Sequence, residues 1–259
     1  MLVEFEPFIY VYQPDMNHLL SSGKNGALPA LFIASISELS QRANSAIFAP
    51  NDLHHWTTLS RDKSRQRLLA SRYLIQQALL WLGADAQPDR AQSGGIDVNT
   101  VTGDPLWISV SYSHDWLACL ISTDGAVGID IEYVQRQRPI VDFAALYLNE
   151  AQLKAFQQMS AEEQEKHFYH WWTAMESVAK WDGSGITAEI LAGRLESEVF
   201  KEGESDALEC ICSSPFEKLF LATAGISQYR SYQCELRDGN FVIAELEAAD
   251  SPSRYRFCY

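Results

Sequence analysis

The sequence is short of positive charge and has no long apolar run. Its 259 residues include 20 Lys and Arg against 34 Asp and Glu, which gives a formal net charge of −14 at pH 7. A general nucleic-acid binder needs a basic surface, so this balance argues against a nucleic-acid partner. No basic segment followed by an apolar stretch opens the chain, and we therefore expect neither a secreted protein nor one that spans or binds a membrane.

Cysteine is scarce, and several catalytic signatures are missing. The five cysteines are odd in number and lack the paired spacing of a zinc site; they are Cys119, Cys210, Cys212, Cys234 and Cys258. We expect reduced thiols in a cytoplasmic protein. The chain contains no Gly-x-Ser-x-Gly elbow and no short-period repeat, which excludes the usual serine-hydrolase motif and a repeat architecture.

Helical and strand-like segments are mixed along both halves of the chain, which predicts an α+β fold. Strands are expected at Leu2–Tyr12, Trp107–Ser113, Leu117–Ser122, Val127–Val134, Leu208–Cys212, Phe220–Thr223, Tyr229–Arg237 and Phe241–Glu247. Helices are expected at Ala30–Ala43, Asp62–Leu82, Asp142–Leu146, Asn149–Met159 and Ala161–Trp181.

Turn-forming residues divide these segments. Asp124-Gly125 predicts a hairpin between the strands on either side of it, and the polar stretch Ala84–Gly103 predicts a loop. Gly183 is expected to end the long second-half helix. We place a boundary near Asp124, giving half-domains at residues 1–124 and 125–259.

The segment Gly128–Glu132 carries the first chemical signal. Ile129 and Ile131 alternate with Asp130 and Glu132, so a strand would bury the isoleucines and present both carboxylates on its other face. Two acids on one strand face repel each other unless water or a cation neutralises them. This pair therefore favours a cation site.

The segment Trp172–Lys180 carries the second signal. Trp172, Glu176 and Lys180 are four residues apart, so a helix would place them in one column. Glu176 and Lys180 alone would be read as an ordinary salt bridge. Combined with the two strand carboxylates, however, Glu176 completes an all-oxygen site of the kind that Mg²⁺ accepts, and Lys180 could hold a phosphate beside it.

A basic island lies earlier in the chain, which suggests a locally bound anion. It comprises Arg61, Lys63, Arg65, Arg67 and Arg72. Lys63 and Arg67 are about as well explained by a solvated helix face. Arg72 falls on the apolar face of its helix, so it must meet either a carboxylate of the protein or a ligand anion.

In order along the chain, Ser113-His114, Gly128–Glu132 and Trp172–Lys180 resemble the phosphopantetheinyl transferases. The resemblance is to the larger monomeric type that activates peptide, polyketide and fatty acid synthases, and it covers roughly residues 60–186. It implies two similar α/β half-domains related by a pseudo-twofold axis, with coenzyme A in the cleft between them. The implied partners are coenzyme A and an apo acyl or peptidyl carrier protein.

The resemblance also implies roles for individual residues. Asp130, Glu132 and Glu176 would hold Mg²⁺, and Glu176, Lys180 and His114 would be catalytic. The residues implied to bind coenzyme A are Ser113, His114, Lys180, Arg65, Arg61 and Arg72, with Arg65 favoured for the adenosine phosphate. The implied reaction, of the holo-[acyl-carrier-protein] synthase type, is attack by a carrier serine on the β-phosphate of coenzyme A.

Three positions depart from the family pattern. Met175 and Asp104 stand where lysines are usual, and Ser111 replaces an asparagine upstream of Ser113-His114. We expect Met175 to pack with its apolar neighbours. Two alternatives to a competent enzyme therefore stay open: an impaired homologue that binds coenzyme A or carrier protein without transfer, and an unrelated Mg²⁺-dependent phosphate-ester hydrolase.

Overall fold

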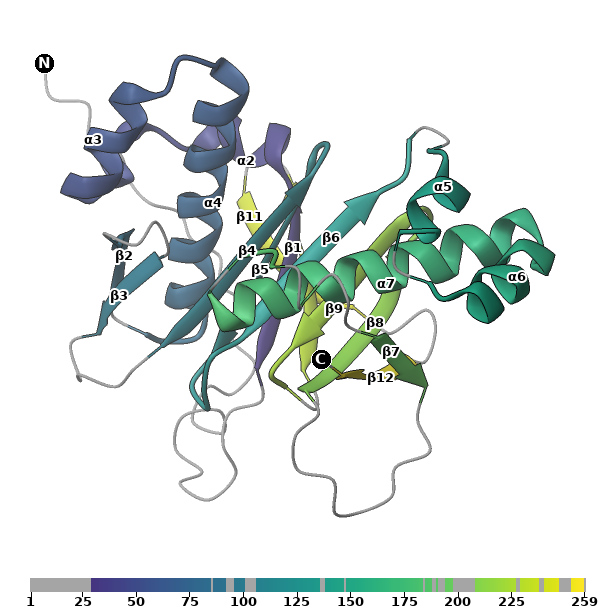
Figure 1. Ribbon diagram of the computed structural model, residues 1–259. Helices are drawn as coiled ribbons and strands as arrows, with labels where there is room; N and C mark the ends of the chain where they lie inside the picture. The colour runs from purple at the N-terminus through teal and green to yellow at the C-terminus, as the bar shows by residue number, and fades with distance from the viewer. Residues whose placement is uncertain are drawn as a thin grey trace, which may run out of the picture.

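The computed structural model describes most of the chain from Pro29 onward (Figure 1). The described residues are 29–84, 86–91, 96–100, 106–135, 138–146, 148–183, 185–187, 190, 194–197, 208–226, 229–237, 240–246 and 253–258. The predicted strand at Leu2–Tyr12 and the position of Asp104 lie outside these residues.

Within the described part of the chain, two five-stranded sheets form the centre of the molecule. The first has the order β11 (Asn240–Glu245), β10 (Arg230–Arg237), β1 (Ala30–Ser35), β5 (Trp116–Ser122) and β4 (Trp107–Ser113). The second has the order β6 (Gly128–Tyr133), β9 (Leu219–Ala224), β8 (Leu208–Phe216), β12 (Ser253–Cys258) and β7 (Arg194–Ser197). A further two-stranded sheet pairs β2 (Ala86–Arg90) with β3 (Ile96–Thr100). The α+β class is confirmed.

Each large sheet carries one long helix. Helix α4 (Asp62–Trp81) packs on the first sheet and α7 (Ala161–Asp182) packs along β6, β9 and β8 of the second (Figure 1). The shorter helices are α2 (Ile36–Arg42), the 3-10 turn η1 (Ser45–Ile47), α3 (Pro50–Thr58), α5 (Ile140–Ala144) and α6 (Glu150–Gln158). Ser160 and Glu163 form a reciprocal capping box at the start of α7, and Gly183 ends it at φ 76°, as predicted. No helix among the described residues is both long and apolar enough to cross a membrane.

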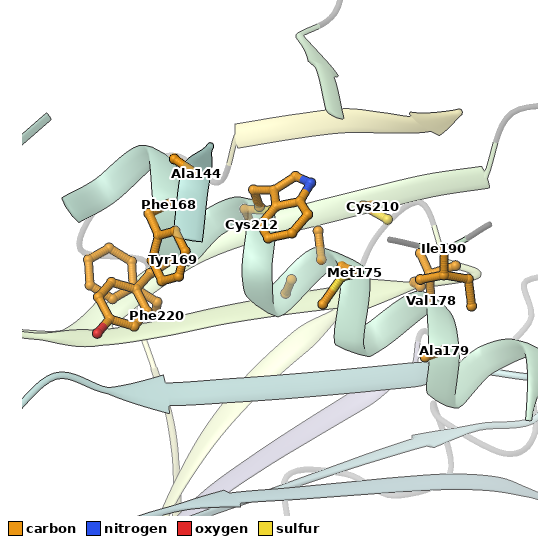
Figure 2. Close-up of a cluster of buried hydrophobic side chains, with 14 of the residues drawn as sticks. Ala144, Phe168, Tyr169, Met175, Val178, Ala179, Ile190, Cys210, Cys212 and Phe220 are labelled. Atoms are coloured by element: carbon orange, nitrogen blue, oxygen red, sulfur yellow. The ribbon is translucent and has the colours of Figure 1, made fainter. Parts of the chain in front are cut away.

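Three apolar clusters hold these layers together. One lies between α7 and the second sheet, where Phe168, Met175 and Val178 face Cys212 and Phe220 (Figure 2). A second lies between α4 and the first sheet. The third joins the two sheets, and in it Ile129 and Ile131 of β6 pack among residues of β1 and β5. The predicted burial of the β6 isoleucines is confirmed, and Met175 is fully buried as expected.

The predicted helix at Ala30–Ala43 is wrong for its first six residues. Ala30–Ser35 is strand β1, which lies between β10 and β5 and is buried on both faces. A short apolar run suits a central strand as well as a buried helix. The helix begins after Ser35, whose side chain accepts a hydrogen bond from the Glu38 N–H.

The predicted loop at Ala84–Gly103 is also wrong, because it contains the hairpin β2–β3. The carboxylate of Asp89 on β2 accepts hydrogen bonds from the backbone N–H of Asp52 and the side chain of Asn51, at 3.1 and 3.0 Å. These contacts tie the hairpin to α3, and a local polar pattern does not reveal them.

Asp124-Gly125 does not form the predicted hairpin, since β5 and β6 belong to different sheets. The two-residue turn is instead His114-Asp115, which joins β4 to β5 with Ser113 opposite Trp116. His114 there has φ 54°, a left-handed conformation. Helix α5 begins two residues earlier than predicted.

Strands β10 and β11 return from the second half of the chain to the first sheet, where β10 pairs in parallel with β1. Residues after Asp124 thus contribute to both sheets. The division at residues 1–124 and 125–259 and the pseudo-twofold axis stay predictions.

Candidate functional site

Gly128 allows α7 to lie directly against β6. A Cβ atom at this position would collide with the carbonyl oxygen of Ser177 and would come within 2.8 Å of the Trp181 backbone nitrogen. Because both obstacles are backbone atoms, a side chain could be accommodated only by moving the helix. The glycine therefore sets the close approach of α7, which carries Glu176 and Lys180, to the strand that carries Asp130.

Lys180 and Asp130 form the central ion pair of this approach. Lys180 Nζ lies 2.8 Å from Asp130 Oδ1 and 3.0 Å from the carbonyl oxygen of Ile129. The Asp130 side chain is 9% exposed and that of Lys180 is 31% exposed. The observed ion pair of Lys180 is with β6 rather than with Glu176, one turn earlier on its own helix.

Glu176 lies within the electrostatic field of both strand carboxylates. Burial and the charge of Asp130 raise the pKa of Glu176, with a smaller contribution from Glu132, while Lys180 opposes the shift. The charges of Asp130 and Glu132 on β6 thus act on Glu176 of α7, and their joint role as a cation site stays a prediction.

Ser113 and His114 end β4 beside this group. The Ser113 hydroxyl donates a hydrogen bond to Glu132 Oε2 at 2.8 Å, and Arg138 Nη2 lies 3.8 Å from the same oxygen. His114 is exposed and meets the ring of Tyr133 edge-on, with ring centroids 5.9 Å apart.

The donor set suits a hard divalent cation in chemistry, because its three acids supply oxygen ligands and repel one another. In this structure the three carboxylates are not arranged as a coordination sphere. No group of three or more His, Cys, Asp or Glu side chains within the described part of the chain is placed to hold a metal ion. In the observed arrangement, Lys180 neutralises Asp130.

A cavity of about 500 Å³ opens beside the ion pair, between α3, α4, the β2–β3 hairpin and β4. Its ionisable lining includes five basic side chains: His55, Arg67, Arg72, Arg90 and Lys180. Among the described residues that line it, none carries a carboxylate. Leucine, isoleucine and valine side chains provide apolar wall. In a chain with a net charge of −14, this is a local concentration of basic side chains, two of which, Arg72 and Lys180, also pair with carboxylates outside the lining.

Arg72 meets the carboxylate that its apolar helix face requires. Its Nε and Nη2 atoms donate to the two oxygens of Asp52, at 2.5 and 2.9 Å, and Asp52 is fully buried. This ion pair anchors α4 to α3 while Arg72 still lines the cavity.

The other predicted arginines of α4 lie elsewhere. Arg61 is the exposed residue before the helix, and Arg65 lies 3.9 Å from Asp62 and over the Trp56 ring. Neither is among the described residues that line the cavity. Their contact with coenzyme A stays a prediction.

Sequence reasoning missed several cavity residues. Arg67, which we also interpreted as a solvated residue, lines the cavity and stacks on Tyr112 of β4, with its guanidinium carbon 4.8 Å from the ring centroid. Arg90 and His55 reach the cavity from β2 and α3. Burial, followed by the charge of Arg90, lowers the pKa of His55. One sequence signal was available for Tyr112. It alternates with serines along β4, which places its side chain on the opposite face of the strand from theirs.

Comparison with known proteins finds a match in the second half of the chain. Residues 126–233 match the family model described as the 4′-phosphopantetheinyl transferase superfamily. The chain is similar to the 4′-phosphopantetheinyl transferases named AcpT of Salmonella typhi and Salmonella typhimurium. It is 36% identical to each over 122 residues, which cover 46% of this chain and 59% of each relative.

A 4′-phosphopantetheinyl transferase of Bacillus subtilis is 29% identical over 86 residues, covering 33% of this chain and 37% of that protein. The chain therefore matches about three-fifths of the length of its Salmonella relatives and less of the Bacillus one. The matched region contains Asp130, Glu132, Glu176 and Lys180. Residues 126–233 of this chain are thus similar to the 4′-phosphopantetheinyl transferase superfamily.

Proposed function

We propose that this protein transfers the 4′-phosphopantetheine arm of coenzyme A to a serine of an apo acyl or peptidyl carrier protein, in a Mg²⁺-dependent reaction. One observation carries the proposal. The basic cavity ends at Lys180, and the same side chain contacts Asp130 of the acidic group. In this proposal an anion site and a cation site would adjoin through one residue, which suits a reaction at a pyrophosphate.

The cavity suits the nucleotide end of coenzyme A. Its basic side chains can neutralise the 3′-phosphate and the pyrophosphate, and its apolar wall, which includes Ile96, Ile108 and Val110, can cover the adenine. Arg67 and Arg72 are our first candidates for the phosphate contacts. Arg65 and Arg61 are candidates that act from outside the cavity.

Asp130, Glu132 and Glu176 would hold Mg²⁺, for which their oxygen donors fit. When bound, Mg²⁺ would neutralise charge on the pyrophosphate. Ser113 and His114, at the end of β4, would face the same end of the substrate.

The protein's own residues supply positioning and proton transfer. The carrier serine oxygen would form a bond to the β-phosphorus as the bond to the bridging oxygen breaks, releasing adenosine 3′,5′-bisphosphate. Lys180 would stabilise the developing negative charge on the leaving phosphate. Glu176 would accept the serine proton.

The proposal extends to the larger monomeric type of the family, acting in the cytoplasm. The presence of two large sheets in one chain supports it, because β4, β6 and α7 of the same chain would supply the proposed site residues. We further propose that the two sheets with their long helices correspond to two similar half-domains.

Incubation with coenzyme A, Mg²⁺ and an apo carrier protein, followed by intact-mass measurement of the carrier, tests the function. A mass gain of one phosphopantetheine, absent when the carrier serine is replaced by alanine, is expected. Tight coenzyme A binding without a mass gain would instead indicate an impaired homologue. Cleavage of coenzyme A without carrier labelling would indicate a hydrolase.

A further inference from the structure

Ser109 is a buried serine of β4 that lines the basic cavity. It is 7% exposed, and its hydroxyl oxygen accepts a hydrogen bond from the Ile129 N–H of β6 at 3.1 Å. A serine hydroxyl also has one hydrogen to donate. No residue in the described part of the chain accepts the hydrogen of Ser109. Because a buried donor without an acceptor is costly, this hydrogen must find its acceptor in the cavity.

Ser71 lines the same cavity from α4 and differs from Ser109 in this respect. It is 4% exposed, and its hydroxyl donates a hydrogen bond to the carbonyl oxygen of Leu68 at 2.8 Å. Its single hydrogen is therefore already used within the helix. Of these two buried cavity serines, Ser109 is the one that keeps a donor for a bound group.

Ser109 and Lys180 contact the same residue of β6. The Ile129 N–H donates to the hydroxyl of Ser109, and the Ile129 carbonyl oxygen accepts a hydrogen bond from Lys180 Nζ at 3.0 Å. The N–H and C=O groups of one strand residue point to the same edge of the strand. The Ser109 hydroxyl and the Lys180 ammonium group therefore lie close together, at the end of the cavity that adjoins Asp130.

The two side chains together keep two donors for a ligand. An ammonium group has three hydrogens, and the acceptors of Lys180 among the described residues are the Ile129 carbonyl oxygen and Asp130 Oδ1. Asp130 also offsets the positive charge of Lys180, so a second donor beside the ammonium group adds attraction for an anion. Two neighbouring donors suit an anionic oxygen, which has several lone pairs, better than a purine nitrogen, which has one.

We propose that Ser109, together with Lys180, binds a phosphoryl oxygen of the coenzyme A pyrophosphate. This inference rests on the proposed function, because it concerns the same cavity and the same ligand. It adds a binding residue that neither the sequence pattern nor the family resemblance indicates. It also divides the cavity, since the pyrophosphate would lie at Ser109 and Lys180 and the 3′-phosphate would be left to the arginines.

The experiment measures the affinity of the full-length protein for coenzyme A and for dephospho-coenzyme A by calorimetric titration, in a chelator and again with Mg²⁺. The variants are Ser109→Ala, Ser109→Thr, Ser71→Ala and Ser111→Ala, with thermal unfolding recorded for each. Ser109→Thr keeps the hydroxyl, and Ser71→Ala removes a cavity hydroxyl whose hydrogen is engaged. Ser111→Ala is a strict control for indirect effects, because it removes the equivalent β4–β6 contact with the Ile131 N–H and a contact with Asp130.

We expect Ser109→Ala to weaken the binding of both ligands about ten-fold and by the same factor, because both contain the pyrophosphate. Ser109→Thr and Ser71→Ala should bind both ligands nearly as the wild type does, and Ser111→Ala should do so in the chelator. Loss of the 3′-phosphate contact at Arg67 should instead affect coenzyme A more than dephospho-coenzyme A. Equal factors in Ser109→Ala therefore indicate the pyrophosphate.

Wild-type affinities in Ser109→Ala would overturn the inference and leave the proposed function standing. The same holds for a loss confined to coenzyme A, for a loss in Ser109→Thr as large as that in Ser109→Ala, and for an equal loss in Ser71→Ala. An equal loss in Ser111→Ala in the chelator would assign the effect to weakened β4–β6 packing and would overturn it too. Absence of coenzyme A binding by the wild type, with and without Mg²⁺, would contradict the proposed function itself, and the inference with it.

Discussion

The ammonium group of Lys180 lies 2.8 Å from the carboxylate of Asp130, and it also lines the basic cavity. This one side chain therefore joins α7 to β6 and the acidic group to the anion site. Its position makes the charge balance of the site depend on Lys180 before any ligand binds. In the proposed reaction the same ammonium group would also interact with an anionic substrate.

Lys180→Ala should reduce carrier labelling by about 10²- to 10³-fold, the usual loss when a charge-stabilising group is removed. The measurement is the initial rate of labelling at saturating coenzyme A. Lys154→Ala, on the exposed face of α6, is the matched control and should retain the wild-type rate. Similar rates for both variants would show that other groups hold the phosphate.

Arg67 and Arg65 make a direct test of which face of α4 binds coenzyme A. Arg67 lines the cavity whereas Arg65 stacks on Trp56 outside it. Arg67→Gln should weaken coenzyme A binding about ten-fold or more, and should affect dephospho-coenzyme A less because that ligand lacks the 3′-phosphate. Calorimetric titration of both ligands measures this. A larger loss of coenzyme A affinity in Arg65→Gln than in Arg67→Gln would contradict this. It would indicate that Arg65, the residue that the sequence favours, binds the 3′-phosphate.

Met175 is fully buried between α7 and the second sheet, so its replacement tests packing rather than catalysis. The family pattern has a lysine at this position, where the sequence predicts that Met175 packs. In the described core the charge of a lysine would be buried, and Met175→Lys should lower the free energy of unfolding by roughly 3 kcal/mol or more. Met175→Leu should cost less than about 1.5 kcal/mol. Urea unfolding distinguishes them, and equal stability of Met175→Lys and wild type would refute this account of the position.

His170 predicts how stability depends on pH. Burial, with smaller effects from Lys166 and His167, lowers the pKa of His170 from 6.5 to about 4. In the unfolded chain the His170 imidazole therefore gains a proton as the pH falls through about 6.5, whereas in the folded chain it gains one only near pH 4. Stability from this residue is present above pH 6.5 and is lost as the pH falls toward 4, by up to on the order of 3 kcal/mol.

The free energy of unfolding in urea, measured at pH 7.5 and pH 5, tests this for the wild type, His170→Gln and His54→Gln. His54 is exposed on α3, so its replacement serves as the control. His170→Gln should show a smaller loss between the two pH values than the other two proteins. An identical loss in all three would remove His170 as the cause.

The sequence was most informative where one local period determined the structure. Alternation in Gly128–Glu132 correctly predicted the burial of Ile129 and Ile131, although Asp130 on the other face is buried as well. Gly183 correctly predicted the end of α7 to within one residue. The apolar run at Ala30 was ambiguous because strand β1 is buried on both faces, which removes the alternation that marks a strand.

Long-range contacts could not be predicted in this way. The apolar neighbours of Arg72 indicate that it needs an anion, but they do not identify Asp52 on another helix. The cavity likewise requires Arg90, whose strand is held against α3 by Asp89. Tertiary packing determines these contacts, and the periodicity of a single sequence contains no signal for contacts between distant elements.

The central claim is transfer of phosphopantetheine at the site formed by β6 and α7. The most direct measurement compares, in the same reaction, the moles of carrier protein that gain one phosphopantetheine with the moles of adenosine 3′,5′-bisphosphate released. The account predicts equal amounts for the wild type in the presence of Mg²⁺, and neither product for Asp130→Asn. Release of the bisphosphate without labelled carrier, or undiminished labelling by Asp130→Asn, would contradict it.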